Sequence, residues 1–258
     1  MKFRPARLVA PALALVAGLP LHFAALADPD ALWRIVHDRC VPAQQRGDGP
    51  APCAAVHLEH GVDHGDAVLK DLRGVLQFLL IPTERITGIE SPAILAPDAT
   101  NYWQDAWDAR RYMGALHGAP LPRDAIALAI NAQAARSQNQ LHIHVSCVRP
   151  DLRARLAAAQ SEIGADWTPL AGGWMGHPYA VRRIVGSDLG PVNPFRLVAG
   201  GVPGAAAAMG AQTIAVVGAR FADGHDGFYV LAGHTDRAAG IEGSAEDDAQ
   251  EHRCTVLR

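Results

Sequence analysis

The segment 140–146 reads Gln-Leu-His-Ile-His-Val-Ser, so that polar and aliphatic residues alternate along it. Alternation with a period of two is typical of a β-strand, whose successive side chains point to opposite faces of a sheet. Gln140, His142, His144 and Ser146 are therefore predicted to share one face, and the aliphatic residues to form the buried face. Two neutral imidazoles about 7 Å apart on a stiff strand suit acid–base, nucleophilic or metal-binding chemistry near neutral pH.

Less specific interpretations remain open for this pattern. A His-X-His pair on a strand is also a familiar metal-binding arrangement, and the pair could simply be the solvent-facing side of a half-exposed sheet. A second polar stretch, residues 57–66, is rich in histidine and aspartate. Its spacing matches no closed metal site, so a solvated loop is favoured there.

The elements that must position the histidines are predicted from apolar periodicity and turn residues. Residues 28–41 have Leu32, Ile35 and Val36 at helical spacing, and a Pro/Gly-rich loop follows. The further elements predicted before residue 166 are strands at 67–70 and 77–81, a helix at 101–117, strands at 125–131 and 141–148, and a helix at 151–165. The fold class predicted from this order is α+β.

The C-terminal third is predicted to contain a strand at 179–184, a helix that includes 205–209, and a hairpin of 213–219 with 227–232. This succession resembles that of the first half, which leaves open a degenerate internal repeat, although no motif is shared. No low-complexity linker separates the halves. We therefore divide the chain into an N-terminal segment (1–27), a catalytic half (28–165) and a C-terminal α+β half (166–258).

Residues 1–27 have the features of an export signal. The first seven residues include three basic side chains, and residues 8–27 carry no charge. The uncharged stretch ends in Ala25-Leu26-Ala27, which has the small-x-small pattern of a signal-peptide cleavage site. The uncharged stretch is also just long enough to span a bilayer. The segment is therefore either a cleaved signal peptide or an uncleaved membrane anchor, and both place the remaining chain outside the cytoplasm.

All four cysteines follow this segment, and four thiols in an exported chain predict two disulfides. Spacing alone permits three connectivities. Cys40 and Cys53 close a short Pro/Gly-rich loop and are the easy pair, which leaves Cys147 for Cys254. A zinc site is less favoured, because the sequence has no Cys-X-X-Cys pair.

Composition narrows the classes of partner. The net charge is −3 with 19% charged residues, so the sequence lacks the concentrated basic character of a nucleic-acid-binding protein. An anionic small molecule or a lipid headgroup stays open, because a few local arginines can bind one without changing the overall charge.

The histidine segment resembles the signature of the histidine triad family, in which three histidines alternate with hydrophobic residues. Other parts arrive in that family's order: the strand 78–82, a helix, a strand ending at Asn131, and Ser137 shortly before the motif. This resemblance implies a histidine triad-like antiparallel sheet with flanking helices.

Within that superfamily the chain is most similar to the bacterial CDP-diacylglycerol diphosphatases. The stretches that carry the similarity are 69–72, 80–83, 88–92, 138–151, 172–173, 176–177 and Cys254, which together cover nearly all of the chain after residue 27. The family implies hydrolysis of CDP-diacylglycerol to CMP and phosphatidate, with no cofactor or metal assigned and no nucleic-acid partner. It also implies contact with a membrane surface, at the periplasmic side of the inner membrane, or in the periplasm if the signal is cleaved.

The resemblance also implies roles for individual residues. The middle histidine of the signature is the nucleophile and maps to His142, and the third maps to His144, which would contact the non-bridging phosphate oxygens. Ser137 would interact with the leaving oxygen, and Asn131 would position the nucleophile or a phosphate. His142 would form a covalent cytidylyl intermediate that water then hydrolyses.

Three further residues are assigned to substrate binding. Gln140 stands where the family has its first histidine, so it can orient a neighbour through hydrogen bonds but cannot carry charge. Lys70 and Asp71 precede the turn where related folds hold the nucleoside, although an aspartate in a tight turn is more often structural. The alternatives are an exported nucleotidyl hydrolase or transferase acting on another CDP-alcohol or nucleotide, and a non-catalytic periplasmic metal-binding protein.

Overall fold

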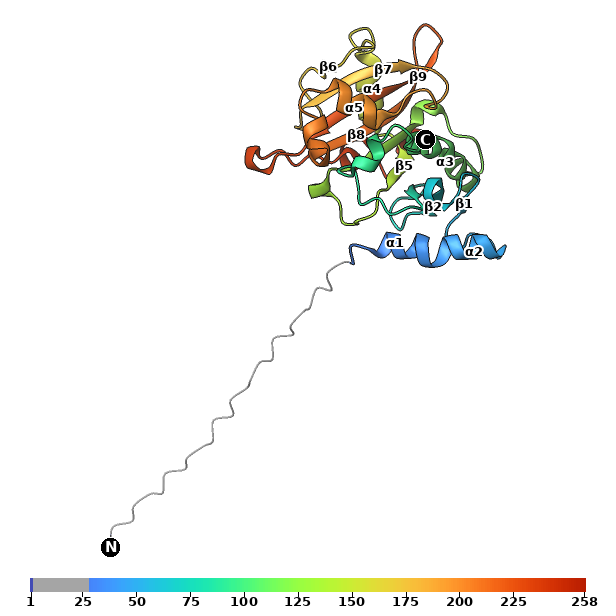
Figure 1. Ribbon diagram of the computed structural model, residues 1–258. Coiled ribbons are helices and arrows are strands. Elements are labelled where there is room, and N and C mark those ends of the chain that lie inside the picture. The colour runs from blue at the N-terminus through green and yellow to red at the C-terminus, as the bar shows by residue number, and fades with distance from the viewer. Residues whose placement is uncertain (2–27) are drawn as a thin grey trace.

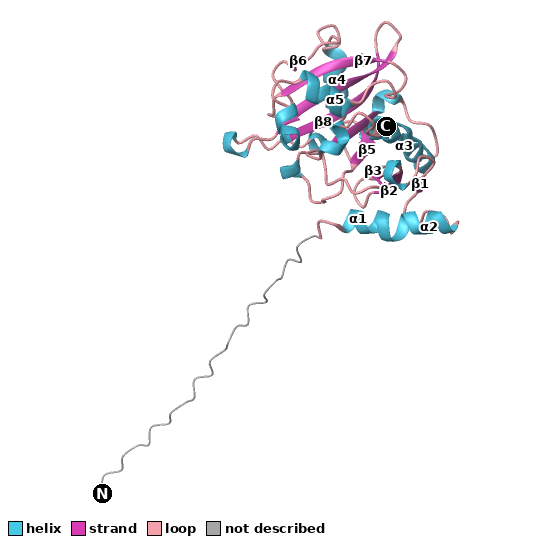
Figure 2. Cartoon of the chain, in the orientation of Figure 1, coloured by secondary structure: helices cyan, strands magenta, loops and turns pink. Residues whose placement is uncertain are grey.

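A computed structural model describes Met1 and residues 28–258; the predicted export segment lies outside the described residues, apart from Met1. One nine-stranded sheet runs through the chain in the order β1-β2-β3-β5-β4-β8-β9-β7-β6, with every neighbouring pair antiparallel (Figure 1). Helices pack against the sheet and occur in the segments that connect its strands (Figure 2). The predicted α+β class, with a large antiparallel sheet, is confirmed.

The strands are β1 (Ala55–His57), β2 (Asp66–Lys70), β3 (Phe78–Pro82), β4 (Ile126–Ile130), β5 (Ile143–Cys147), β6 (Thr168–Pro169), β7 (Tyr179–Val185), β8 (Gln212–Arg220) and β9 (Asp226–His234). The α-helices are α1 (Ala31–Ile35), α2 (Val41–Arg46), α3 (Tyr102–His117), α4 (Pro150–Ala158), α5 (Pro194–Gly201) and α6 (Ala245–Ala249). The main predicted hairpins and the helix at 101–117 are therefore present.

Several predicted bounds are wrong. The first helix does not end at residue 41, because a π-helical turn at Val36–Cys40 joins α1 to α2. The helix passes Pro42 and ends at Arg46, with Gly47 as its C-cap. The helix predicted at 151–165 ends at Ala158, and the segment 206–211 is a 3₁₀ helix. The short strands β1 and β6 and the helix α5 were not predicted, since each is too short for a periodic signal.

One face of the sheet is covered by α3 and α5. Ile143 and Val145 of β5 point into this face, together with the large aromatic side chains of the two helices. Trp103 packs edge-on against Phe195, with ring centroids 5.2 Å apart. The aliphatic face of the histidine strand is therefore buried, as its alternation predicts.

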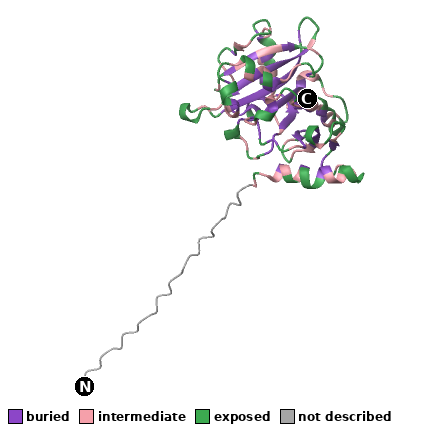
Figure 3. Ribbon diagram, in the orientation of Figure 1, coloured by how far each residue is buried: buried purple, intermediate pink, exposed green. Residues whose placement is uncertain are grey.

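The other face of the sheet carries two separate apolar clusters. The cluster beneath α1 and α2 includes Leu79 and Ile81 of β3, and the cluster beneath α4 and α6 includes Ala127 and Ala129 of β4. Since β5 lies between β3 and β4, its polar residues lie between these two clusters. Figure 3 shows the buried strands and the exposed outer side of α1 and α2.

Both predicted disulfides are present. Cys40 is bonded to Cys53 at a sequence separation of 13, and Cys147 to Cys254 at a separation of 107. The second bridge fastens the C-terminal segment to the end of the histidine strand. Among the described residues, no helix is both long and apolar enough to cross a bilayer.

The strand order is symmetric about the pairing of β4 with β8. Outward from the centre the strands are β4, β5, β3 and β2 on one side, and β8, β9, β7 and β6 on the other; β1 is an additional edge strand beyond β2. Within the symmetric part, each half has two strands, a helix and two strands in chain order: β2, β3, α3, β4 and β5 in the first, and β6, β7, α5, β8 and β9 in the second. Helix α4, which ends the first half, packs Leu152 and Leu156 into the same cluster as Val181 and Tyr229 of the second.

Candidate active site

The histidine row lies on the central strand β5 and just before it. His144 stands opposite Leu79 of β3 and Ala129 of β4, and His142 immediately precedes the strand. Ala127 and Ala129 are small, so this face of β4 leaves room for a covering segment.

The C-terminal segment, residues 244–252, fills that room and covers the polar row. Gln250 donates from Nε2 to the carbonyl oxygens of Ala127 (2.7 Å) and His144 (3.0 Å). The exposed fractions of Gln140 and Ser146 are 0%, and that of His144 is 6%. The prediction that only the aliphatic face is buried is therefore wrong, because a distant segment supplies polar partners to the other face.

His142 is held in a single tautomer by the main chain. Its Nδ1 lies 2.7 Å from the carbonyl oxygen of Gln140, which can only accept a hydrogen bond. Nδ1 must therefore carry the proton, and Nε2 must keep its lone pair. Such an imidazole has one ring nitrogen fixed by the protein and the other free to attack an electrophile.

Burial keeps this imidazole neutral. Burial lowers the pKa of His142 to about 4, and the neighbouring ring of His144 acts in the same direction. The two rings meet edge to face, with centroids 4.9 Å apart. At neutral pH the lone pair on Nε2 of His142 is therefore not occupied by a proton.

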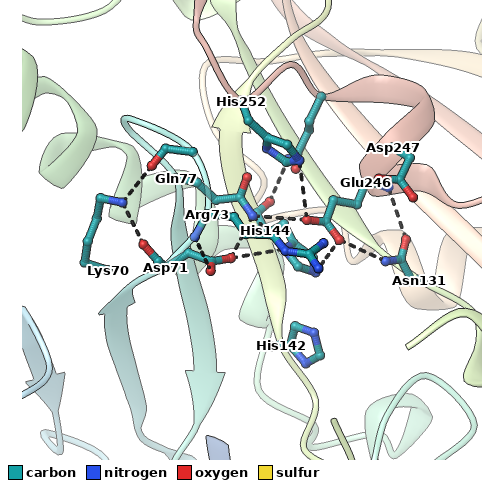
Figure 4. Close-up of polar contacts among 12 residues, drawn as sticks. Lys70, Asp71, Arg73, Gln77, Asn131, His142, His144, Glu246, Asp247 and His252 are labelled. Atoms are coloured by element: carbon teal, nitrogen blue, oxygen red, sulfur yellow. Dashed lines mark hydrogen bonds and ion pairs between the residues drawn. The ribbon is translucent and has the colours of Figure 1, made fainter. Parts of the chain in front are cut away.

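His144 lies deeper, within a hydrogen-bond network (Figure 4). Its Nε2 is 3.2 Å from Oε2 of Glu246, and its Nδ1 is 3.2 Å from Nε2 of Gln77. A carboxylate of Asp71 lies 4.0 Å from the same Nδ1. Burial lowers the pKa of His144 to about 4 despite the opposing effect of Asp71. Neutral His144 then donates from Nε2 to Glu246 and accepts at Nδ1 from Gln77.

Asn131 fixes the position of Glu246. Its Nδ2 donates to Oε2 of Glu246 (3.2 Å), while its Oδ1 accepts from the main-chain N–H of Glu246 (3.1 Å) and the hydroxyl of Ser244 (3.0 Å). Ser244 is the N-cap of α6 and accepts from the main chain of Asp247. The predicted site residue Asn131 therefore holds the first turn of α6 against the histidine strand.

Asp71, His144 and Glu246 each place one potential ligand atom within 4.8 Å of the others, which is close enough to share a metal ion. Nε2 of Gln77 lies 2.8 Å from Asp71, 3.1 Å from Glu246 and 3.2 Å from His144. The amide nitrogen of Gln77 therefore lies between the three groups, and its two N–H hydrogens can be donated to two of them at a time. The polar stretch 57–66 forms no comparable group among the residues described.

The predicted substrate-binding residues have different surroundings. Gln140 donates from Nε2 to the carbonyl oxygens of Pro82 (3.1 Å) and Glu84 (2.8 Å), so its side chain braces the end of β3. Lys70 donates to the carbonyl oxygens of Asp71 (2.8 Å) and Gly74 (2.9 Å), which stabilises the turn between β2 and β3. These contacts leave the Lys70 ammonium occupied by its own turn.

Ser137 is exposed in the loop between β4 and β5, and within the described part of the chain its hydroxyl has no hydrogen-bond partner. The structure thus brings His142, His144, Asn131, Gln140 and Asp71 together, but not Ser137 or Lys70. The residues that sequence reasoning missed are Gln77, Arg136 and Glu246. Glu246 is separated from His144 by about a hundred residues along the chain, and no local pattern marks it.

A small cavity of about 10 Å³ reaches His142 and is lined by Gly88, Ile89, Ile130, Asn131, Arg136, Gln140, Leu141 and His142. Its volume is about that needed for one water molecule. The described arrangement is therefore a closed site with a free imidazole nitrogen at its wall.

Comparisons with known proteins agree on the family. A family model described as CDP-diacylglycerol pyrophosphatase matches residues 27–258. A protein named CDP-diacylglycerol pyrophosphatase from Yersinia pestis is 42% identical over 243 residues, which are 94% of this chain and 90% of the relative. The family match includes both the histidine strand and the C-terminal segment that covers it. The chain therefore belongs to the CDP-diacylglycerol pyrophosphatase family.

Proposed function

We propose that the chain hydrolyses CDP-diacylglycerol in two displacements, with His142 as the nucleophile. Family membership supplies the enzyme class, a phosphoric anhydride hydrolase of phospholipid metabolism. The observation that carries the mechanism is the hydrogen bond from Nδ1 of His142 to the carbonyl oxygen of Gln140, at 2.7 Å. It leaves the lone pair of Nε2 available for attack.

In the first displacement, Nε2 of His142 forms a bond to the cytidine-bearing phosphorus as the bond from that phosphorus to the bridging oxygen breaks. Phosphatidate leaves with the electron pair of the broken bond. In the second displacement, water attacks the same phosphorus and the P–N bond breaks. CMP leaves, the proton of the water passes to the products, and neutral His142 is restored.

His144 is proposed to contact the non-bridging oxygens, and its N–H is already oriented by the protein. In the closed site this N–H faces Glu246, 3.2 Å away. Substrate would therefore take the place of Glu246 as acceptor, or share the donor with it. Ser137 at the leaving oxygen and Asp71 and Lys70 near the nucleoside remain proposals that rest on the resemblance.

Replacing Glu246 with glutamine tests the support that this carboxylate gives to His144. The change keeps the size of the side chain but removes the charge that accepts from Asn131, Gln77 and His144. We expect kcat for CMP release to fall by about 10²-fold with little change in the temperature of unfolding. Glu251→Gln, in the same C-terminal segment, is the matched control and should keep full activity. Equal activity in the two variants would contradict the role of Glu246.

The pH dependence should report the lowered pKa of His142. Because burial lowers this pKa to about 4, the nucleophile keeps its free lone pair as the pH falls from 7 to 5. The acid limb of kcat/KM should therefore lie near pH 4 rather than near the ordinary histidine value of about 6.5. A titration of the imidazole by NMR in the free protein provides an independent check. An acid limb near 6.5 in both measurements would show that the imidazole is not shielded as described.

We also propose that the fold is histidine triad-like and that its two halves are degenerate repeats. The symmetric strand order about β4 and β8 supports this, because β5 and β9 then occupy equivalent positions. Strand β9 has only His234, at its end, whereas the His-X-His pair lies at the start of β5, with His142 just before the strand and His144 within it. The halves 28–165 and 166–258 would thus share a topology, with only the first retaining the chemistry.

The proposed location is outside the cytoplasm, at the periplasmic side of the inner membrane or free in the periplasm. The pattern of residues 1–27 and the two disulfides support it. The lipid nature of the family's substrate supports contact with a membrane surface. Neither argument depends on whether the N-terminal segment is cleaved.

The function is tested by assaying CMP release from CDP-diacylglycerol in detergent micelles and from CDP-glycerol, which has the same anhydride but no acyl chains. We expect efficient hydrolysis of the lipid and a much lower kcat/KM for the soluble alcohol. Preferential hydrolysis of CDP-glycerol would favour a soluble CDP-alcohol as substrate. Absence of activity on both, with stoichiometric uptake of Zn²⁺, would favour the metal-binding alternative.

A further inference from the structure

A buried guanidinium lies in the wall of the closed site. Arg136 belongs to the loop between β4 and β5, and the exposed fraction of its side chain is 6%. It lines the same cavity as His142 and Asn131. Its Nε has no hydrogen-bond partner within residues 28–258. Because a buried N–H without an acceptor is costly, this edge of Arg136 is open to an acceptor from outside the chain, a water molecule or a substrate oxygen.

Glu90 fixes the plane of this guanidinium. Both terminal nitrogens of Arg136 bond to the Glu90 carboxylate, with NH2 2.7 Å from Oε1 and NH1 bonded to Oε2. The hydroxyl of Thr87 donates to the same carboxylate at 2.8 Å. A bidentate pair of this kind holds the guanidinium in one orientation and leaves the Nε edge available.

Gly88 makes room for Arg136. A Cβ atom added at Gly88 would lie 2.2 Å from NH1 of Arg136 and 2.7 Å from its Cζ. Both atoms lie in a guanidinium held by Glu90, so it could not move aside without breaking that pair. The backbone at residue 88 therefore has to approach the arginine closely, which accounts for glycine in the stretch 88–92.

The charges of the site call for such a cation. His142 and His144 are neutral at pH 7 because burial lowers both pKa values to about 4, while Asp71 and Glu246 bring carboxylates. The substrate adds an anionic diphosphate, and a leaving phosphate gains further charge as its bond breaks. Neither histidine can offset this as a cation, so a buried arginine beside His142 is the group suited to do so.

The contacts of the loop that carries Arg136 also indicate that the lipid half of the substrate would lie near this residue. The main-chain N–H of Asn139 donates to the carbonyl oxygen of Pro29 (2.6 Å), and Gln138 bonds to Asp28 and to Leu32 (3.0 Å each). Gln138 and Asn139 are thereby tied to the residues that directly follow the predicted export segment. A lipid presented from a membrane at that segment would arrive from this side.

We propose that Arg136 is a further catalytic residue, which binds the phosphate of the departing phosphatidate and offsets the charge that develops on it. This rests on the proposed function. The cavity holds about one water molecule, so binding of the diphosphate beside Arg136 requires part of the cavity lining to move. Glu90 is a positioning residue that keeps the guanidinium oriented towards the diphosphate.

Two substrates distinguish a role of Arg136 at the leaving phosphate from a general role in catalysis. CDP-diacylglycerol has the second phosphate, whereas the 4-nitrophenyl ester of CMP lacks it and has a leaving group that needs no cation. We expect Arg136→Gln to lower kcat for CDP-diacylglycerol by 10²-fold or more, on the order seen when one stabilising donor is removed. The loss on the nitrophenyl ester should stay below about tenfold, since its leaving group makes no contact with Arg136. Arg136→Lys should be intermediate, and added guanidinium should partly restore Arg136→Ala.

Inhibition by products gives a second measurement that does not need the nitrophenyl ester. The inhibition constant of short-chain phosphatidate should rise in Arg136→Gln by about tenfold, while that of CMP stays unchanged. Arg123→Gln is the matched structural control, because Arg123 is also largely buried and pairs with a carboxylate, Asp226 (3.2 Å). Thermal unfolding of each variant identifies loss of fold.

Equal losses on both substrates, with unchanged phosphatidate inhibition, would overturn the assignment of Arg136 to the leaving phosphate. Full activity in Arg136→Gln would overturn it as well. A wild-type protein that releases no CMP from CDP-diacylglycerol would instead contradict the proposed function. The two failures are therefore distinguishable.

Discussion

Replacing His142 with alanine should lower kcat for CMP release by about 10⁴-fold or more, on the scale found when a catalytic nucleophile is removed. The replacement deletes the only atom proposed to form the covalent bond, and it leaves water to attack an anionic diphosphate directly. The strand should persist, since β5 is held by pairing to β3 and β4 and by the disulfide at Cys147. The effect should therefore appear in kcat and not in the folded fraction.

His60→Ala is a suitable control for this variant, because His60 is exposed and lies outside the histidine network. Steady-state CMP release measured beside unfolding curves for both variants separates chemistry from stability. Substantial activity in a correctly folded His142→Ala protein would mean that another group attacks the phosphorus.

Removing the Cys147–Cys254 disulfide should give the largest loss of stability among the cysteine changes. The bridge closes 107 residues, so its loss should lower the free energy of unfolding by about 4 to 5 kcal/mol in the loop-entropy treatment. Replacing Cys40 and Cys53, which close only 13 residues, should cost about 3 kcal/mol. Denaturant unfolding of the two double-serine variants gives the comparison directly.

The first of these variants should also lose activity, because its bridge fastens the segment that carries Glu246 over the histidine strand. The second should retain activity, since Cys40 and Cys53 belong to a separate apolar cluster that does not include the histidine strand. Equal activities in the two variants would show that the C-terminal segment stays in place without its covalent link.

The histidine strand could be predicted because its signal is local. A period of two over seven residues places His142 and His144 on one face regardless of what surrounds them. The helix at 101–117 could be predicted for a similar reason, because its apolar residues recur at helical spacing over several turns. The disulfides could also be predicted. Once the short loop pairs Cys40 with Cys53, only Cys147 and Cys254 remain to form the second bond.

The covering of the polar face could not be predicted in this way. Glu246, Gln250 and Gln77 come from segments far from β5 in the chain, and each reaches the histidine strand only through tertiary packing. The alternation of residues 140–146 says which side chains share a face, but not whether solvent or protein meets that face. The alternation also could not predict the partners of Gln140, because its hydrogen bonds to Pro82 and Glu84 depend on how β3 ends.

The central claim is that His142 carries a cytidylyl group during turnover. The most direct measurement is to quench the protein in base during steady-state hydrolysis of CDP-diacylglycerol, digest it, and examine the peptides by mass spectrometry. We predict one cytidylyl group on the peptide containing His142, stable to base and lost in acid, and none in His142→Asn. An active enzyme that shows no adduct in rapid-quench samples, or an adduct on another residue, would contradict the account.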